Sequence, residues 1–274
     1  MATGLSLHIG LRRVAPAVFT GVFPYKEPKD NDLKGCDRDA TEMAALASSL
    51  GYTVMGTFLN DAAQFDPVKA HMKTAASTLG PGDIFFVTFS GHGNQITDSE
   101  PNVDEDGGQD DTWVFFDQEV RDDTFAELWL TFDPGVRIVV VLDSCSSGTA
   151  IAMLEGPAGD GPLNALLAED LDAAEEATAS TPTLTDQINS RGPVVLLLAS
   201  SPDGGTTPAA SDELSTSPYT TALLDTFKQR PFSNGYEGLH SQIQAAFPLA
   251  QLYVLGPQGA DFRGFITSTQ PFQI

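Results

Sequence analysis

Two stretches decide the fold: DIFFVTFSGHG at residues 83–93 and RIVVVLDSCSSG at residues 137–148. Each contains a nearly continuous run of Val, Ile, Leu and Phe and ends in a polar turn that contains glycine. Nearly continuous apolar runs of this length are typical of strands buried on both faces, as in a parallel sheet covered by helices. Four further runs have the same character, so we predict strands at 5–11, 52–59, 83–90, 137–144, 194–200 and 251–255.

Helical patterns occupy gaps between these strands. DATEMAALASSL at 39–50 predicts a helix that stops at Gly51. A second helix is expected to start with Asp66 as its cap and Pro67 in its first turn, and a third with Ser217 as its cap before Pro218. The alternation predicts an α/β fold: a sandwich with a mostly parallel six-stranded sheet flanked by helices.

We expect one domain, because 274 residues with 41% hydrophobic content can bury a single large core. Within it we distinguish a larger portion at 1–154, an acidic linker at 155–191 and a smaller portion at 192–274. The linker is rich in Ala, Gly, Pro and acidic residues and is expected to be partly disordered or weakly helical. Residues 98–111 hold acidic but no basic side chains and are expected to form a loop.

Composition restricts the partners and the compartment. A net charge of −23, from 37 acidic and 14 basic side chains, repels nucleic-acid backbones and anionic membranes. Two cysteines are too few for a disulfide framework, and a reducing cytoplasm is the simpler expectation. We find neither a signal-peptide pattern nor an apolar run long enough to span a membrane, so a soluble, unexported protein is predicted.

The candidate reactive residues are His92 and Cys145, which follow the strands at 83–90 and 137–144. The carboxyl ends of parallel strands meet at one edge of a sheet, where ligands bind. If these strands are neighbours, an imidazole can take the proton of a thiol there, and the amides of Gly93 and Cys145 can face an oxyanion. Taken alone, a buried Cys or a His beside Gly is usually structural, so the pairing carries the prediction.

The sequence resembles bacterial metacaspases and orthocaspases, caspase-like cysteine peptidases. The resemblance rests on successive blocks, LKGCDRDATEMAALASSLGYTV, DIFFVTFSGHGNQ, DDTW, VRDDTF, VRIVVVLDSCSSGT and ASSPDGGTTPA with SPYTTALLDTF, which cover nearly the whole chain. His92 also precedes Cys145 by the roughly 50 residues usual for caspases. Two departures are Ser146, where the family often has His, and the missing QAC signature of animal caspases.

The resemblance implies an endopeptidase that cleaves after Arg or Lys. Matching blocks place Asp39, Ser90 and Asp143 in the pocket for the basic side chain, where carboxylates would make charge-assisted hydrogen bonds. The alternative roles are a helix N-terminal carboxylate for Asp39 and turn chemistry for Asp143. Asp203 fits a third pocket carboxylate and an Asx turn equally well.

The resemblance also implies calcium dependence and a monomer. The matching calcium positions are Asp110, Asp122 and Asp123, whose oxygens suit that ion. A solvated acidic loop is the alternative. NVDEDG at 102–107 is not an EF-hand start, because position twelve falls on Trp113 instead of Glu.

The competing function is a catalytically silent, caspase-like scaffold, against which the presence of both His92 and Cys145 counts. A thiol hydrolase of the α/β-hydrolase type is disfavoured because DSCSS lacks the glycine two residues before the nucleophile.

Overall fold

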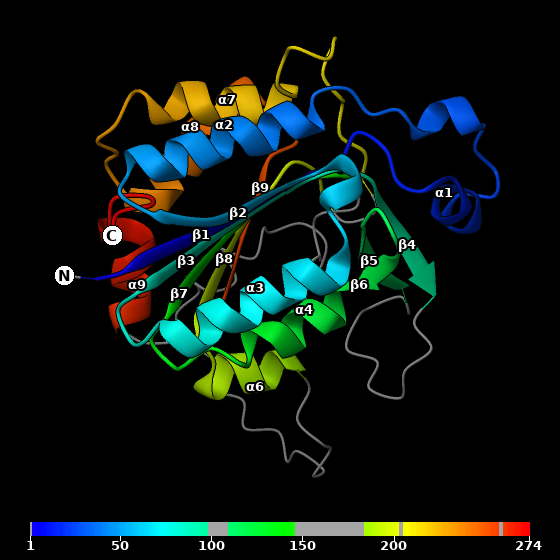
Figure 1. Ribbon diagram of the computed structural model, residues 1–274. Helices are drawn as coiled ribbons and strands as arrows, with labels where there is room; N and C mark the ends of the chain where they lie inside the picture. The colour runs from blue at the N-terminus through cyan, green and yellow to red at the C-terminus, as the bar shows by residue number, and fades with distance from the viewer. Residues whose placement is uncertain (1, 98–108, 146–183, 203–204, 258–259) are drawn as a thin grey trace, which may run out of the picture.

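A six-stranded sheet runs through the centre of the molecule in the computed structural model, which describes residues 2–97, 109–145, 184–202, 205–257 and 260–274 (Figure 1). Its strands, in spatial order, are β2 (Thr53–Leu59), β1 (Gly4–Gly10), β3 (Ile84–Ser90), β7 (Arg137–Asp143), β8 (Val194–Ala199) and β9 (Gln251–Leu255). The first five are parallel, and β9 runs antiparallel to β8. The predicted strands and the mostly parallel sheet are therefore confirmed.

Helices cover both faces of this sheet (Figure 1). One layer contains α2 (Cys36–Ser49), α7 (Pro218–Phe227) and α8 (Gly235–Ala246), with α9 (Ala260–Ser268) against α8; the other contains α3 (Phe65–Thr78), α4 (Asp122–Trp129) and α6 (Leu184–Arg191). Successive strand residues enter opposite cores: Phe85 and Val87 pack on the α3 side, and Phe86 packs on the α2 side. Burial on both faces explains why the strands are nearly continuous apolar runs in the sequence.

The helix ends follow the predictions in part. Ser217 caps α7, and its Oγ accepts a hydrogen bond from Thr220 N at 3.0 Å, as predicted. The predicted stop at Gly51 is also confirmed, since α2 ends just before it and Gly51 has a φ of +91°. The Asp66 cap is wrong: Gln64 is the N-cap of α3, and Asp66 lies inside the first turn, where its charge suits the helix dipole.

A second, small antiparallel sheet follows β3. It consists of β4 (Gly93–Thr97), β5 (Gln109–Val114) and β6 (Glu119–Arg121). The loop predicted at 98–111 is corrected at its end, because residues 109–111 belong to β5; residues 98–108 lie outside the described residues. Most of the predicted linker, up to residue 183, also lies outside them, and its last part is α6.

Short elements lie beyond the carboxyl edge of β1. They are α1 (Pro16–Val22) and the 3-10 turns at Pro28–Asn31 and Asn60–Ala62. Figure 1 shows α1 and the small sheet at the same end of the molecule, away from the two chain ends.

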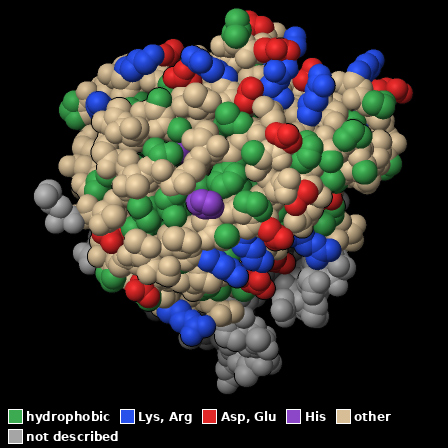
Figure 2. All heavy atoms as spheres, in the orientation of Figure 1, with side chains coloured by type: hydrophobic (Ala, Val, Ile, Leu, Met, Phe, Trp, Pro, Cys, Tyr) green, Lys and Arg blue, Asp and Glu red, His purple; other side chains and the backbone are tan. Residues whose placement is uncertain are grey.

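The surface seen in Figure 2 carries basic and acidic side chains side by side. Arg13 and Asp32 form an ion pair, with 3.0 Å between Nη2 and Oδ2. Among the residues that the structure describes, no helix is both long and apolar enough to cross a bilayer.

Candidate catalytic site

The register of β3 and β7 brings the turns that carry His92 and Cys145 together. Ser90, the last residue of β3, pairs with Asp143, the last residue of β7. Beyond this rung, Gly91 N donates to Asp143 O at 3.3 Å. His92 and Cys145 therefore leave the same edge of the sheet, each two residues past the final rung.

Gly93 is where the two turns come closest. A Cβ at this position would overlap the carbonyl oxygen of Cys145 and lie 3.2 Å from Ser144 Oγ. Only a residue without a side chain fits such a close backbone approach. The contact keeps the turn after β3 directly against the turn after β7.

The His92 ring is buried in an aromatic clasp, defined here as Phe19 and Phe23, whose centroids are each 5.5 Å from the imidazole. Its Nε2 lies 3.3 Å from the carbonyl oxygen of Asn31. A proton on Nε2 satisfies that carbonyl and leaves Nδ1 as the acceptor, so this bond selects the tautomer. The Asn31 side chain is itself anchored, because it accepts from Val14 N at 3.1 Å and donates to Val14 O at 2.9 Å.

The environment keeps His92 neutral. Burial lowers the pKa of His92 to about 4, and the charge of Lys26 acts in the same direction against the opposing bond to Asn31. At neutral pH the imidazole is therefore able to accept a proton. Sequence reasoning missed Asn31, Phe19 and Phe23 because they lie far from SGHG; the aromatic pair at a spacing of four in PAVFTGVF was the available signal.

Cys145 is half-buried and has no disulfide partner, and Cys36 is also a free thiol. The turn before it is held by the end of β8: Ser144 O accepts from Ser200 Oγ at 3.3 Å and Ser201 Oγ at 3.1 Å. Cys145 thus lies in a turn that hydrogen bonds hold at the end of a central strand.

The predicted pocket residues Asp39, Ser90 and Asp143 form one buried cluster, although they come from α2, β3 and β7. Ser90 Oγ donates to Asp39 Oδ2 at 2.8 Å, as the resemblance implied when it placed the two together. Asp39 lies in the first turn of α2, so its alternative role as a helix N-terminal carboxylate is compatible with a place in the pocket cluster.

The two carboxyl groups share a proton-binding environment. Burial, and then the charge of Asp143, raise the pKa of Asp39 to about 8. Burial also raises the pKa of Asp143. Two acidic groups in one desolvated cluster cannot both ionise cheaply, so the cluster retains a proton at neutral pH. A cation that enters the cluster would reduce the repulsion between the two carboxylates, so both could then be ionised.

The remaining predicted residues are placed differently. Asp203 lies outside the described residues. Asp110 forms an ion pair with Arg121, with 3.2 Å between Oδ2 and Nε, while Asp122 and Asp123 occupy the first turn of α4. In the described part of the chain, no three His, Cys, Asp or Glu side chains are grouped to hold a metal ion. The described residues therefore do not fit a calcium centre by themselves.

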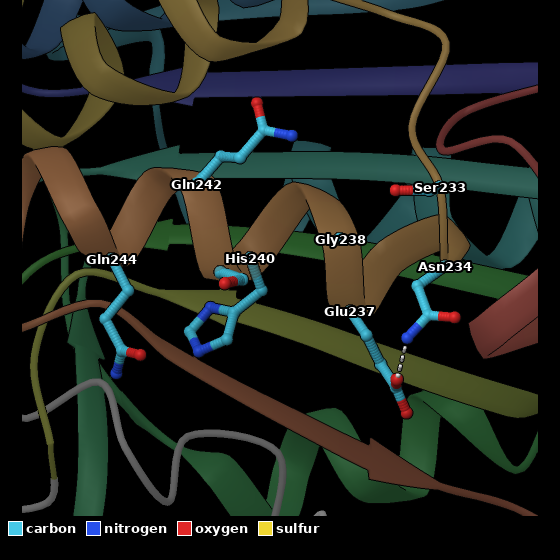
Figure 3. A pocket seen from close by; sticks show the side chains of 8 residues that line it. Ser233, Asn234, Glu237, Gly238, His240, Gln242 and Gln244 are labelled. Carbon is cyan, nitrogen blue, oxygen red and sulfur yellow. Dashed lines mark hydrogen bonds between the residues drawn. The ribbon is translucent and has the colours of Figure 1, made fainter.

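A polar depression of about 530 Å³ lies elsewhere on the molecule (Figure 3). It is lined by Ser233 to Gln244, chiefly along α8, and includes His240 but no cysteine. Its lining residues come from one continuous stretch, so they do not converge from different elements as those around His92 do. The strand-end site is the stronger candidate for chemistry.

Comparison with known proteins shows the family of this chain. Residues 17–258 match the family model described as Caspase domain, of the peptidase C14 group. "Metacaspase-1B" of Aspergillus niger is 34% identical over 135 residues, which are 44% of this chain and 30% of that protein. "Metacaspase-4" of Arabidopsis thaliana is 29% identical over 157 residues, 54% of this chain and 37% of that protein. The chain thus matches only about a third of the length of these relatives.

Solved structures support the fold over the whole chain. Protein GSU0716 from Geobacter sulfurreducens superposes with a TM-score of 0.71 and 26% identity, covering 99% of each chain. Caspase-1 from Spodoptera frugiperda superposes with a TM-score of 0.55 over 99% of this chain and 90% of its own, at 10% identity, which bears on the fold alone. With the family model matched from residue 17 to residue 258, the chain belongs to the caspase-domain family, peptidase C14.

Proposed function

We propose that this protein is a cysteine endopeptidase that cleaves after Arg or Lys, with Cys145 as nucleophile and His92 as general base. The observation that carries the proposal is the strand-end site, in which a neutral His92 and a free Cys145 leave the last rung of β3 and β7 beside two buried acids. Membership of the caspase-domain family supports the reaction class.

The proposed reaction begins with transfer of the Cys145 thiol proton to Nδ1 of His92. The sulfur then adds to the carbonyl carbon of the scissile bond, and the amides of Gly93 and Cys145 stabilise the oxyanion. His92 returns the proton to the departing amine, which leaves an acyl group on Cys145. Water activated by His92 hydrolyses this thioester. Asn31 holds the imidazole in the tautomer that these steps need.

Specificity for a basic side chain follows from the chemistry of Asp39, Ser90 and Asp143. A guanidinium or ammonium group would neutralise the buried carboxyls, whereas an acidic side chain would add to their repulsion. We also propose that the enzyme acts as a monomer, on protein or peptide substrates, as the resemblance implies.

Calcium stimulation is proposed on the family resemblance alone. Because Asp110 is paired with Arg121, no step of the proposed reaction uses the ion. Peptide hydrolysis measured with calcium and with a chelator decides whether the ion is required.

The test is hydrolysis of fluorogenic peptides ending in Arg, Lys or Asp by wild type, Cys145→Ala and His92→Ala. His71→Ala is the matched control, since His71 lies on the outer part of α3. Turnover of Arg or Lys peptides by wild type and His71→Ala, lost in the other two variants, supports the proposal. Turnover of Asp peptides overturns the pocket assignment. No turnover with or without calcium favours the silent scaffold instead.

A further inference from the structure

A single serine touches both acids of the proposed pocket. Ser217 lies at the N-terminus of α7 and is buried. Its backbone N donates to Asp39 Oδ1 at 2.8 Å, and its Oγ donates to Asp143 Oδ2 in a short hydrogen bond. Ser217 therefore connects a carboxyl on α2 to a carboxyl at the end of β7.

The cap of α7 holds this bridge in place. Ser217 Oγ also accepts from Thr220 N at 3.0 Å, and Thr220 Oγ donates to Asp143 Oδ2 at 2.8 Å. The first turn of α7 thus supplies two hydroxyl donors to one oxygen of Asp143. An orientation fixed by several hydrogen bonds leaves the carboxyl little freedom to rotate.

We propose that Ser217 is a positioning residue for substrate specificity: it holds Asp39 and Asp143 as one bridged pair, which releases a proton to solvent when it binds a basic side chain. The inference rests on the proposed function, because it concerns the pocket of that enzyme. It adds a residue that the sequence indicated only as a helix cap.

Neighbouring charges favour proton retention before the substrate arrives. Asp37, on α2, acts on Asp39 in the same direction as Asp143. Cys36 and Tyr219 also face the pair, and burial raises the pKa of each of them, so both are neutral at physiological pH. The cation Arg12, whose charge interacts with Asp37, is engaged by Glu213 and Asp32. A substrate cation therefore supplies the charge that the pair lacks.

The hydroxyl donors act against proton retention. Hydrogen bonds from Ser217 and Thr220 lower the pKa of Asp143, although burial keeps it raised. Loss of the Ser217 hydroxyl should thus make the pair hold its proton more tightly. Binding of Arg or Lys would then require a higher pH, whereas the reaction at Cys145 would be unaffected.

The first experiment measures KM and kcat from pH 6 to 9 for an Arg peptide with wild type, Ser217→Ala and Ser217→Thr. Thr216→Ala is the matched control, because its hydroxyl contacts Thr221 and belongs to the same segment. We expect KM of Ser217→Ala to rise about tenfold at pH 7, the loss of one charge-assisted hydrogen bond, with kcat within about twofold. The pH profile of its KM should move to higher pH. Ser217→Thr should restore both the wild-type KM at pH 7 and the wild-type pH profile.

A second readout does not depend on turnover. Agmatine, which is arginine without its carboxylate group, is titrated into each variant by calorimetry in two buffers of different ionisation enthalpy. Binding to wild type should release a fraction of a proton at pH 7, and Ser217→Ala should bind agmatine about tenfold more weakly. Iodoacetamide labelling of Cys145 at wild-type rate, together with an unchanged circular dichroism spectrum, shows that the variant is folded.

The outcomes separate the two proposals. Unchanged or improved KM in Ser217→Ala, or agmatine binding without proton release, overturns the role of Ser217 while the peptidase assignment stands. A wild type that binds agmatine with proton release but cleaves no peptide overturns the proposed function while the bridged pair stands.

Discussion

Replacing Gly93 by Ala tests the close approach of the two turns. The added Cβ would overlap the carbonyl oxygen of Cys145, which is backbone and cannot rotate away. One of the turns has to move by about 1 Å, and a misplacement of that size costs roughly 100-fold in rate. We therefore expect kcat/KM for an Arg peptide to fall about 100-fold, equivalent to about 2.7 kcal/mol of transition-state stabilisation.

Gly21→Ala is the control for this experiment. It introduces the same methyl group in α1, where nothing lies within 4 Å, and should leave kcat/KM within about twofold while slightly favouring the helix. Both variants are compared with wild type by peptide hydrolysis and thermal unfolding. A Gly93→Ala enzyme with at least one third of wild-type kcat/KM would refute the contact between the turns.

Three further predictions concern pH and processing. His92 must be neutral to accept a proton, so kcat should be lost as the pH falls through about 4; a limb near pH 6.5 would contradict the buried, aromatic environment. Burial lowers the pKa of His8 to about 3 from 6.5, so the unfolded state takes up the proton first and stability should fall with pH from about 6.5 downwards, by roughly 2 kcal/mol at pH 5. The free energy of unfolding of His8→Gln, measured with urea, should depend less on pH than that of the wild type. Equal slopes in the wild type and His8→Gln would argue against this role of His8. Residues 138–190 contain no Lys or Arg, so intact-mass measurement of active enzyme should find no break within 155–190.

The main sheet was predictable because its pattern is strong. Strands such as Ile84–Ser90 are buried on both faces and flanked by turns, so their composition alone identifies them. The antiparallel direction of β9 was not predictable, since a buried apolar run has the same pattern in either direction. The small sheet was missed because strands such as Gln109–Val114 begin with polar residues. Backbone hydrogen bonds hold such residues in a strand, but their composition does not indicate one.

The candidate site divides along similar lines. Strand ends indicated His92 and Cys145, and the family resemblance indicated Asp39, Ser90 and Asp143. The tautomer-selecting Asn31 carbonyl was out of reach, because any residue type presents the same backbone oxygen. Ser217 was recognisable as a cap, but its bonds to both acids depend on the packing of α7 across the sheet edge.

The final rung between Ser90 and Asp143 has a consequence for control of the enzyme. The two turns follow β3 and β7, and each of these strands is paired with a neighbour on both sides. Sliding β3 past β7 would break the hydrogen bonds between them, and a shift of one residue would turn buried side chains to the opposite face. The spacing of the reactive pair is therefore a poor target for a switch. Segments that meet the edge from outside, such as the one around Asn31 and the start of α7, have no such ladder. Movement of these segments, by tilting the imidazole or opening the acid pair, would alter the site while the sheet stays as it is.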